Sequence, residues 1–423
     1  MPDHIHLCLL SAQPVPNLMS ILELRPDRIA LLETVEMRKS RVRENLLAAL
    51  ALAGEGYNYT DLVEVCELDK PDELIDAAQA LHALVERHPG AHWSVNLTGG
   101  TKIMAIAAHK VFEPMGAILY YLEIGRPDQI QCLNNGERVS CGRRLSIEQF
   151  LRSYGYRAGH AADGALHRHL LPLARAIAQN EDALMIDPSV WTSLRNGKLK
   201  AGPGQIRVTN DALHQAFFEE AQRRVDLPGK LGPLTLEKNS LVGRIDKVTG
   251  DFLTGGWLET LLYGVLENHA ADLELWDLRL NLHIAPVADG AAAQSGFDNE
   301  LDIAFMHSHA LHSIECKSGA QEHDPDVGAL YKIEAVLSQL RALLRSAALA
   351  STSDNIYSRD SRTGQVLEGQ IKPALIERAR FNHWTIIDRE KIRQMAAAKT
   401  EVEEIALLRG CLGIKSAEKE SAT

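Results

Sequence analysis

The sequence lacks the cysteine pairs of a zinc site, a long apolar run and an excess of positive charge. Its six cysteines include no C-x-x-C pair and no cysteine–histidine cluster at zinc-ligand spacing, which excludes a zinc finger and a disulfide-stapled secreted domain. We expect most of these thiols to be buried in a reducing compartment. No stretch approaches the roughly 18 to 20 apolar residues that span a bilayer. The amino terminus also carries acidic and histidine residues where a signal peptide carries basic ones. These absences predict a soluble cytoplasmic protein without a membrane partner.

The charge balance is acidic. Lysine and arginine total 45 against 56 aspartate and glutamate residues, so the formal net charge is −11. This value excludes a histone-like protein that coats nucleic acid through a global basic field. It still allows a nucleic-acid enzyme, because such an enzyme needs only a local basic groove and its metal-binding carboxylates lower the net charge.

Apolar core residues, in contrast, are plentiful. The 423 residues are 45% hydrophobic and 24% charged, which is the composition of a folded protein and not of a disordered one. Domains centre on about 100 to 150 residues, and single cores rarely exceed about 300. We therefore expect two or three domains.

The first 150 residues alternate short apolar runs with amphipathic stretches. Strands are predicted at residues 5–10, 28–32, 62–66, 92–97 and 117–122, and helices at 36–53, 71–87 and 101–112. Strands that alternate with helices at this spacing form a mostly parallel sheet with helices on both faces. The sequence therefore predicts a doubly wound α/β domain over residues 1–153.

Two further segments follow this domain. Residues 154–250 carry helical patterns at 165–179 and 211–225 and predict a small helical or winged-helix connector. Residues 251–415 read as one helix, three strands, a second helix and a last strand. The helices are expected at 256–268 and 328–349, and the strands at 276–284, 300–307, 310–317 and 384–388. This pattern predicts a second α/β domain.

A glycine turn follows the fourth predicted strand. It consists of Thr98, Gly99, Gly100, Thr101 and Lys102 in the segment SVNLTGGTK. Glycines let the backbone approach a ligand closely, and the free N–H groups of a helix start favour a phosphate. Such a turn lies at the carboxyl edge of an α/β sheet, where these folds bind ligands, and the polar turn at Ser11 to Pro14 would share that edge. The pattern fits neither a Walker loop nor the dinucleotide fingerprint. A well-capped structural turn explains the same residues equally well.

Two successive strands of the last domain carry carboxylates and a lysine. Asp302 lies near the start of one strand, and Glu315 and Lys317 lie at the end of the next. Side chains alternate faces along a strand, so Glu315 and Lys317 project together, and a hairpin of this length would place Asp302 beside Glu315. Two carboxylates on neighbouring strands make a hard-oxygen site for Mg²⁺ or Mn²⁺, which activates water and offsets charge on a scissile phosphate. Lys317 would orient that water or stabilise the transition state.

A third carboxylate lies upstream, in the segment GGWLE that opens the helix expected at 256–268. Its Glu259 would complete the metal site, and the set predicts phosphodiester hydrolysis without a covalent intermediate. The alternative is a surface Glu–Lys pair on an edge strand, since an E-x-K triplet arises by chance in most chains of this size. The histidines near the hairpin match no ligand spacing and are expected to be solvated or to lie in the hairpin loop. They are His307, His309 and His312.

Both constellations resemble known families. SVNLTGGTK, after a strand of an N-terminal α/β domain, resembles the turn of the CRISPR-associated Rossmann-fold (CARF) sensors. Asp302 with Glu315-x-Lys317 resembles the PD-(D/E)xK restriction-endonuclease-like nucleases, although Leu301 stands where the name of the motif has proline. Their order in one chain is similar to that of the CARF nucleases, which are ancillary effectors of type III CRISPR systems.

This resemblance implies a Rossmann-like CARF domain, a connector and a restriction-endonuclease-like nuclease domain. It also implies a homodimer that binds one cyclic oligoadenylate, commonly cyclic tetra-adenylate, and then cuts RNA or DNA with Mn²⁺ or Mg²⁺ and little sequence preference in antiviral defence. Carried over by position, the activator-binding residues would be Ser11, Gln13, Asn96, Thr98, Gly99, Gly100, Thr101 and Lys102. The catalytic residues would be Glu259, Asp302, Glu315 and Lys317, with the three acids as metal ligands.

Two other functions fit the residues. One is a constitutive DNA nuclease of repair or restriction, whose α/β domain only dimerises or binds a different nucleotide. The other is a ligand-responsive regulator that binds nucleic acid and carries a degenerate nuclease fold. The polar glycine turn disfavours an α/β domain that merely dimerises, and the complete set of two acids and a lysine disfavours a degenerate nuclease fold.

Overall fold

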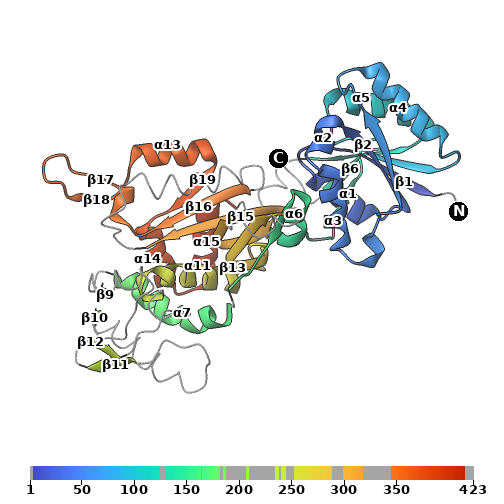
Figure 1. The fold of residues 1–423 in the computed structure, drawn as a ribbon. Coiled ribbons are helices and arrows are strands. Elements are labelled where there is room, and N and C mark those ends of the chain that lie inside the picture. The colour runs from blue at the N-terminus through green and yellow to red at the C-terminus, as the bar shows by residue number, and fades with distance from the viewer. Residues whose placement is uncertain are drawn as a thin grey trace.

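The computed structural model describes residues 3–123, 129–162, 164–181, 184–186, 206–208, 234–237, 240–243, 252–287, 299–318 and 344–414. These residues form an N-terminal and a C-terminal unit, which meet at the short helix α6 (Figure 1). All six cysteines are free thiols and buried, as the composition predicted. No helix within the described ranges is both long enough and apolar enough to cross a membrane.

The N-terminal unit is built on a seven-stranded sheet in the order β3-β2-β1-β4-β5-β6-β7. Its strands are β1 (His4–Leu9), β2 (Arg28–Thr34), β3 (Val63–Leu68), β4 (His92–Asn96), β5 (Ile118–Leu122), β6 (Gln129–Cys132) and β7 (Arg138–Ser140). Neighbours among β1 to β5 pair in parallel, and β6 and β7 are antiparallel. The chain adds β2 and β3 on one side of β1 and then β4 and β5 on the other side. The strand order therefore reverses between β1 and β4.

Helices cover both faces of this sheet. They are α1 (Val15–Leu24), α2 (Val35–Lys39), α3 (Val42–Ala51), α4 (Leu74–Glu86), α5 (Lys102–Phe112) and α6 (Ile147–Ser153), with short 3-10 turns at Glu55–Tyr57 and Glu113–Met115. Successive side chains of β1 point to opposite faces of the sheet, so the strand contributes to the core beneath each layer of helices. Ile5, Leu7 and Leu9 pack with α4 and α5 on one face, while Cys8 packs with α1, α3 and α6 on the other. The predicted doubly wound domain is confirmed.

The single helix predicted at residues 36–53 is wrong, because the chain breaks it at Arg41, whose φ is 56°. A fully buried carboxylate, that of Glu33, lies beside this break. Arg38 Nε and Arg43 Nη1 approach the same Glu33 oxygen, at 3.6 and 3.4 Å, from the two sides of the break. Residues five apart on one straight helix point in different directions, and the interrupted backbone brings both arginines to this acid.

The C-terminal unit is built on a six-stranded sheet in the order β19-β16-β15-β14-β13-β8. Its strands are β8 (Tyr156–Ala158), β13 (Trp276–Pro286), β14 (Asn299–His307), β15 (Ala310–Lys317), β16 (Leu344–Ser351) and β19 (Trp384–Ile387). Strands β8, β13, β14 and β15 pair antiparallel in succession, and β15, β16 and β19 pair in parallel. The three central strands predicted from the sequence are confirmed.

Helices pack on this second sheet as well. They are α7 (Gly164–Gln179), α11 (Trp257–Asn268), α13 (Pro373–Asn382), α14 (Arg389–Ala397) and α15 (Glu401–Leu412). Helices α7, α11, α14 and α15 share one core with Ile314 and Cys316 of β15. A hairpin of β17 (Tyr357–Arg359) and β18 (Val366–Ile371) projects beside α13 (Figure 1).

The helix predicted at residues 328–349 is wrong where the structure describes it, because residues from Leu344 onward form strand β16. Residues 328–343 lie outside the described ranges. The segment LRSAALAS is rich in good helix formers, which is why a helix was expected. Its position between β15 and β19 decides otherwise, since Ala347 to Ala350 are buried there and the small side chains let helices pack closely on the sheet.

The stretch at residues 154–250 divides between two structures. Strand β8 joins the C-terminal sheet, and α7 confirms the helix predicted at 165–179 and packs on α11. A small four-stranded sheet contains β9 (Leu184–Ile186), β10 (Ile206–Val208), β11 (Leu234–Glu237) and β12 (Ser240–Gly243) in the order β11-β12-β10-β9. The helix predicted at 211–225 lies outside the described residues.

Candidate functional sites

A tight hairpin joins β14 and β15 and fixes the relation of the carboxylates. His307 pairs with Ala310, and the two residues between them, Ser308 and His309, have φ values of 48° and 55°. Positive φ at both central residues is the mark of a type I′ turn, whose twist matches that of the strands. The register continues to Ile303 opposite Ile314. The next pair along this register is Asp302 and Glu315, as the length of the hairpin predicted.

Lys317 lies between the two carboxylates of this hairpin. Its Nζ is 2.6 Å from Glu315 Oε1 and 3.8 Å from Asp302 Oδ2. The backbone N–H of Cys316 donates to Asp302 Oδ2 at 2.6 Å. Glu315 and Lys317 therefore share one side of the strand, while Cys316 between them is buried in the core beneath α11.

Glu259 comes to the same region from the first turn of α11. The helix starts immediately after Gly255 and Gly256, and a Cβ at Gly255 would lie 2.8 Å from Ser318 Oγ, just beyond the end of β15. Gly255 therefore leaves room for the side chain of Ser318 beside the start of the helix. Glu259 is partly buried here, and the negative charge of Asp302 acts on it.

Burial and crowding of negative charge dominate the electrostatics of these residues. Burial, reinforced by the charge of Asp302, raises the pKa of Glu259 to about 8. Burial and the charge of Glu315 raise the pKa of Asp302 well above its usual value. Burial alone would lower the pKa of Lys317, but Glu315 and Asp302 raise it above the ordinary lysine value. Lys317 is therefore a permanent cation that donates hydrogen bonds and cannot act as a general base near neutral pH.

The donor set suits a hard divalent cation. Carboxylate oxygens are the ligands that Mg²⁺ and Mn²⁺ prefer, and a bound ion would replace the protons that the raised pKa values of Glu259 and Asp302 retain. Within the described ranges, however, no three acidic, histidine or cysteine side chains stand close enough to share one ion. The chemistry of Glu259, Asp302 and Glu315 therefore fits a metal, although the three side chains do not converge on one point.

The predicted activator residues lie at the carboxyl edge of the N-terminal sheet. Turns after β1 and β4 meet there, which is the place where the strand order reverses and where α/β folds bind ligands. Gly99 makes this meeting possible, since a Cβ on it would lie 2.1 Å from the carbonyl oxygen of Leu9. Gly100 has a φ of 70°, which favours glycine.

Some polar side chains of this edge are buried in the domain, and others are exposed to solvent. Asn96 is fully buried and donates to Pro16 O, Asn17 Oδ1 and Ser20 Oγ, at 3.1, 2.9 and 3.2 Å. Its side chain thus holds the two turns together from below. Lys102 and Gln13, in contrast, are exposed.

The threonine hydroxyls of the turn already have protein partners. Thr98 Oγ1 accepts from the backbone N–H of Leu122 at 2.8 Å. Thr101 caps α5 by accepting from Met104 N and donates to Pro71 O at 3.1 Å. Ser11 Oγ is within hydrogen-bond distance of the backbone of Gln13. The capped-turn interpretation therefore accounts for these hydroxyls, and the backbone N–H groups, Gln13 and Lys102 are what the edge offers to a ligand.

Sequence reasoning missed two residues at these sites. Asn281 of β13 contacts Glu259, and the hydroxyl of Tyr154, which ends α6, donates to Gln13 Oε1 at 2.9 Å. Neither residue belongs to a motif. A polar residue in a strand or at the end of a helix is common, so the sequence gives no signal for either one.

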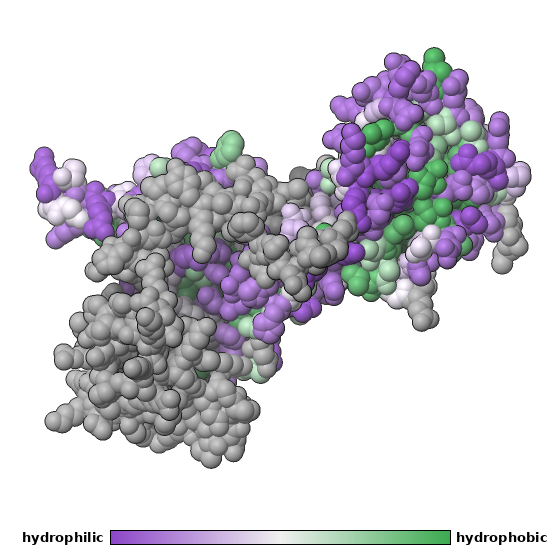
Figure 2. Space-filling view, in the orientation of Figure 1, coloured by the Kyte–Doolittle hydropathy of each residue, from purple (hydrophilic) through white to green (hydrophobic). Residues whose placement is uncertain are grey.

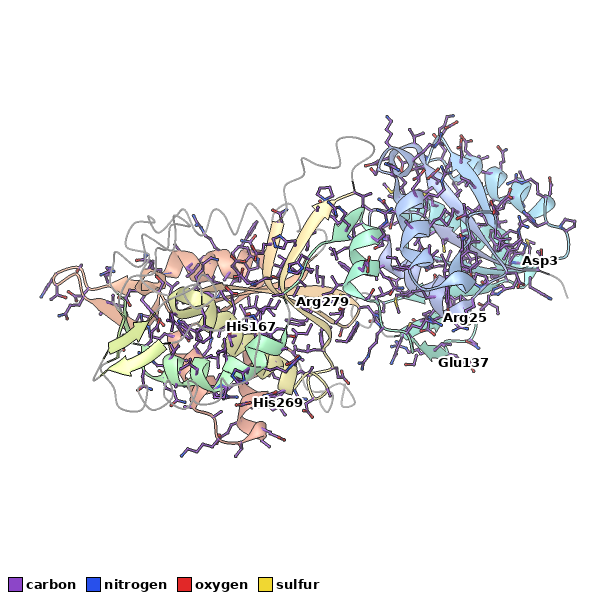
Figure 3. All side chains as sticks on the ribbon, turned by 60° about the horizontal axis from the view of Figure 1, so that its bottom comes forward. Asp3, Arg25, Glu137, His167, His269 and Arg279 are labelled. Atoms are coloured by element: carbon purple, nitrogen blue, oxygen red, sulfur yellow. The ribbon has the colours of Figure 1, made fainter. Side chains whose placement is uncertain are left out.

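Several histidines of the C-terminal unit contact other side chains. His167 and His269 are labelled in Figure 3. His269 pairs with Glu404 at 2.7 Å, and His167 Nδ1 is 2.7 Å from Thr260 Oγ1. In the hairpin, His312 stacks on Phe305 and His309 packs edge-on against Trp276. His309 lies in the hairpin loop, as one alternative expected, but His309 and His312 are both buried, so the solvated alternative is wrong for these two.

Comparison with known proteins identifies both units. The family model described as the Card1 CARF domain matches residues 5–150. A second model, described as the Card1-like endonuclease domain, matches residues 246–381. The chain belongs to the CARF-nuclease family. Its N-terminal unit is a CARF domain, and its C-terminal unit is an endonuclease domain, in the order that the sequence predicted.

Solved structures share this fold over nearly the whole chain. Protein VC1899 from Vibrio cholerae is 18% identical with a TM-score of 0.69, and the match covers 96% of this chain and 98% of that chain. Can2 from Sulfobacillus thermosulfidooxidans, in complex with cyclic tetra-adenylate, is 19% identical with a TM-score of 0.64, and the match covers 96% of each chain. At these identities the likeness shows the fold alone. No curated protein sequence matches the chain.

Proposed function

We propose that this protein is a divalent-metal-dependent nuclease that a cyclic oligoadenylate, in the first place cyclic tetra-adenylate, switches on. The observation that carries the proposal is the set of Asp302, Glu315 and Lys317 on the β14–β15 hairpin of an endonuclease domain. The CARF domain in the same chain supplies the ligand-binding edge. The ring is proposed because Can2, which has the same fold, was solved with it.

The chemistry proposed for the site is hydrolysis of a phosphodiester. The oxygen of a water molecule bonds to phosphorus while the water gives up one proton, one P–O ester bond breaks, and the leaving oxygen takes up a proton. Held by Glu259, Asp302 and Glu315, Mn²⁺ or Mg²⁺ would supply a water of lowered pKa and offset the charge that builds on the phosphate. Lys317 stays protonated and donates to the attacking water or to a phosphate oxygen. Glu315 keeps Lys317 in place through their 2.6 Å contact.

The proposed switch follows from ligand-binding thermodynamics. A ring with symmetric phosphates suits two equivalent helix starts related by a two-fold axis, so we propose that the active form is a homodimer. A ligand activates only if it binds one arrangement of the protein better than another. We therefore propose that ring binding favours the arrangement in which the nuclease domains accept RNA or DNA. This activity would serve antiviral defence as part of a type III CRISPR response.

The test is a cleavage assay with purified full-length protein. Labelled single-stranded RNA, single-stranded DNA and supercoiled plasmid are incubated with Mn²⁺ or Mg²⁺, with and without cyclic tetra-adenylate. We expect cleavage to need both the metal and the ring. Glu315→Ala should lower the rate by about a hundredfold or more, because it removes both a carboxylate ligand and the partner of Lys317. Glu377→Ala on exposed α13 is the matched control and should cut normally.

Each failure has a distinct meaning. Cleavage without the ring would favour a constitutive nuclease, and the CARF domain would then bind something else. Unchanged cleavage by Glu315→Ala would mean that the assigned residues are not the catalytic ones. No cleavage under any condition, together with binding of nucleic acid that responds to the ring, would favour the regulator with a degenerate nuclease fold.

A further inference from the structure

Asn281 lies among the acids of the nuclease site, although no sequence motif contains it. It belongs to β13, which pairs with β14 through Leu280 opposite Ile303 and Leu282 opposite Leu301. This register places Asn281 directly across from Asp302. The amide orientation that satisfies both its oxygen and its nitrogen puts Nδ2 3.1 Å from Glu259 Oε2 and 3.3 Å from Asp302 O. One side chain thus connects the helix that carries Glu259 to the strand that carries Asp302.

The backbone at this position is also unusual. Asn281 has a φ of 48°, in the left-handed region, although it lies inside a strand. Asparagine is among the few non-glycine residues that adopt this region readily. A polar residue that merely faces solvent from a strand needs neither this conformation nor two partners. Residue 281 must therefore tolerate a positive φ and also provide an amide that reaches both Glu259 and the backbone of Asp302.

The chemistry of the amide suits its neighbours. Glu259 and Asp302 already repel each other, so a further carboxylate would add to the crowding of negative charge. A lysine at this position would instead neutralise the charge that is to attract a cation. An amide donates a hydrogen bond without changing the charge of the site.

We propose that Asn281 is a positioning residue of the nuclease site, whose amide fixes the carboxylate of Glu259 relative to Asp302 and thereby sets the affinity for a divalent cation. This inference rests on the proposed function, because it takes these two acids as ligands of the ion. Residues that hold metal ligands in place typically change metal affinity about 10- to 100-fold when they are replaced.

The test variant is Asn281→Gly. Glycine accepts positive φ without strain, so the substitution removes the amide and keeps the backbone conformation. Ser308→Gly is the matched control, because Ser308 also has a φ of 48° and lies in the turn of the neighbouring β14–β15 hairpin. Melting curves of each full-length variant fix a temperature at which all of them are folded.

The readout is binding of Mn²⁺ alone, followed by the loss of the electron paramagnetic resonance signal of the free ion. We expect Asn281→Gly to raise the dissociation constant about tenfold and Ser308→Gly to match the wild type. In the cleavage assay, Asn281→Gly should need more Mn²⁺ for half-maximal rate and approach the wild-type rate when Mn²⁺ is in excess. A purely structural role would lower the rate at every Mn²⁺ concentration.

Glu259→Gln separates the possible failures. If Glu259→Gln weakens Mn²⁺ binding and Asn281→Gly binds like the wild type, the role assigned to Asn281 is wrong and the proposed metal site stands. If Mn²⁺ binds the wild type and Glu259→Gln equally, Glu259 is not a ligand and the proposed metal site itself is wrong. Weaker binding in both variants, with an unchanged Ser308→Gly control, supports the inference.

Discussion

At the scale of single residues, Gly99 shows how closely the ligand-binding edge is packed. A Cβ at this position would lie 2.1 Å from the carbonyl oxygen of Leu9, which is a rigid backbone atom at the end of β1. We expect Gly99→Ala to push the two turns apart and to lower the stability of the protein by about 1 to 3 kcal/mol. Thermal unfolding measures this change. Gly142→Ala, with no atom within 4 Å of the added Cβ, is the control, and equal melting temperatures for both variants would contradict the packing argument.

A second residue-scale prediction concerns pH. Burial raises the pKa of Glu259 from 4.5 to about 8, so between these values the folded protein holds a proton that the unfolded chain has lost. Stability then falls as pH rises, because the folded state binds more protons. We expect the melting temperature of the metal-free protein to fall between about pH 5 and pH 8. Asp302 shifts in the same direction and adds to the effect.

Replacing Glu259 by glutamine removes this titration. The fall in melting temperature should therefore be smaller in Glu259→Gln, whereas Glu377→Gln on exposed α13 should behave like the wild type. Scanning calorimetry in chelator-treated buffers makes the comparison. A pH profile identical in Glu259→Gln and wild type would show that Glu259 does not carry the shift.

At the scale of elements, the sequence predicts a feature well when residues close together in the chain determine it, and poorly when distant residues do. The relation of Asp302 to Glu315 was predictable, because a period of two and a short hairpin determine it. Strand β16 was not, since its alanines favour a helix and only the neighbouring strands override that preference. Asn281 was not predictable either, because nothing in the alternation of β13 reveals its positive φ or the approach of Glu259 from α11.

Among the described residues, helix α6 and the residues just before it contact the C-terminal domain. Its first N–H, on Ile147, donates to Asp277 Oδ2 at 2.6 Å, and Trp276 Nε1 donates to Leu145 O at 2.6 Å just before the helix. At its other end the hydroxyl of Tyr154 reaches Gln13 of the ligand-binding edge. Apolar residues of α6 and of the nuclease sheet also form one continuous core. The helix is therefore placed to pass a movement of the edge to strand β13.

This contact predicts a variant that separates ring binding from activation. Trp276→Phe keeps an aromatic ring and removes the N–H that reaches Leu145. A lost hydrogen bond of about 1 kcal/mol corresponds to about a fivefold effect, so ring-stimulated cleavage should fall about fivefold while the affinity for the ring is unchanged. Calorimetry and the cleavage assay measure the two quantities. Trp384→Phe on β19 is the matched control, and a parallel loss of affinity and cleavage would argue against a coupling role.

At the scale of the whole molecule, one chain presents one ligand-binding edge, whereas a cyclic tetra-adenylate ring has several equivalent phosphates. Figure 2 shows apolar residues at the surface of the CARF domain between polar ones. Large apolar side chains exposed there include Ile106 at 53% and Ile118 and Val139 at 46% each. Singly exposed apolar side chains are ordinary on a protein surface, so the expectation of a second copy rests on the symmetry of the ring.

We therefore expect light scattering to report twice the chain mass of 46.6 kDa, and titration calorimetry to report one ring for two chains. Lys102→Ala should weaken ring binding about 10- to 100-fold, because it removes a charged contact from each half of a shared site. Lys110→Ala, at the other end of α5 and also exposed, should bind normally. If the protein is a monomer that binds one ring per chain, a single ligand-binding edge holds a whole ring. Activation would then have to act within a single chain.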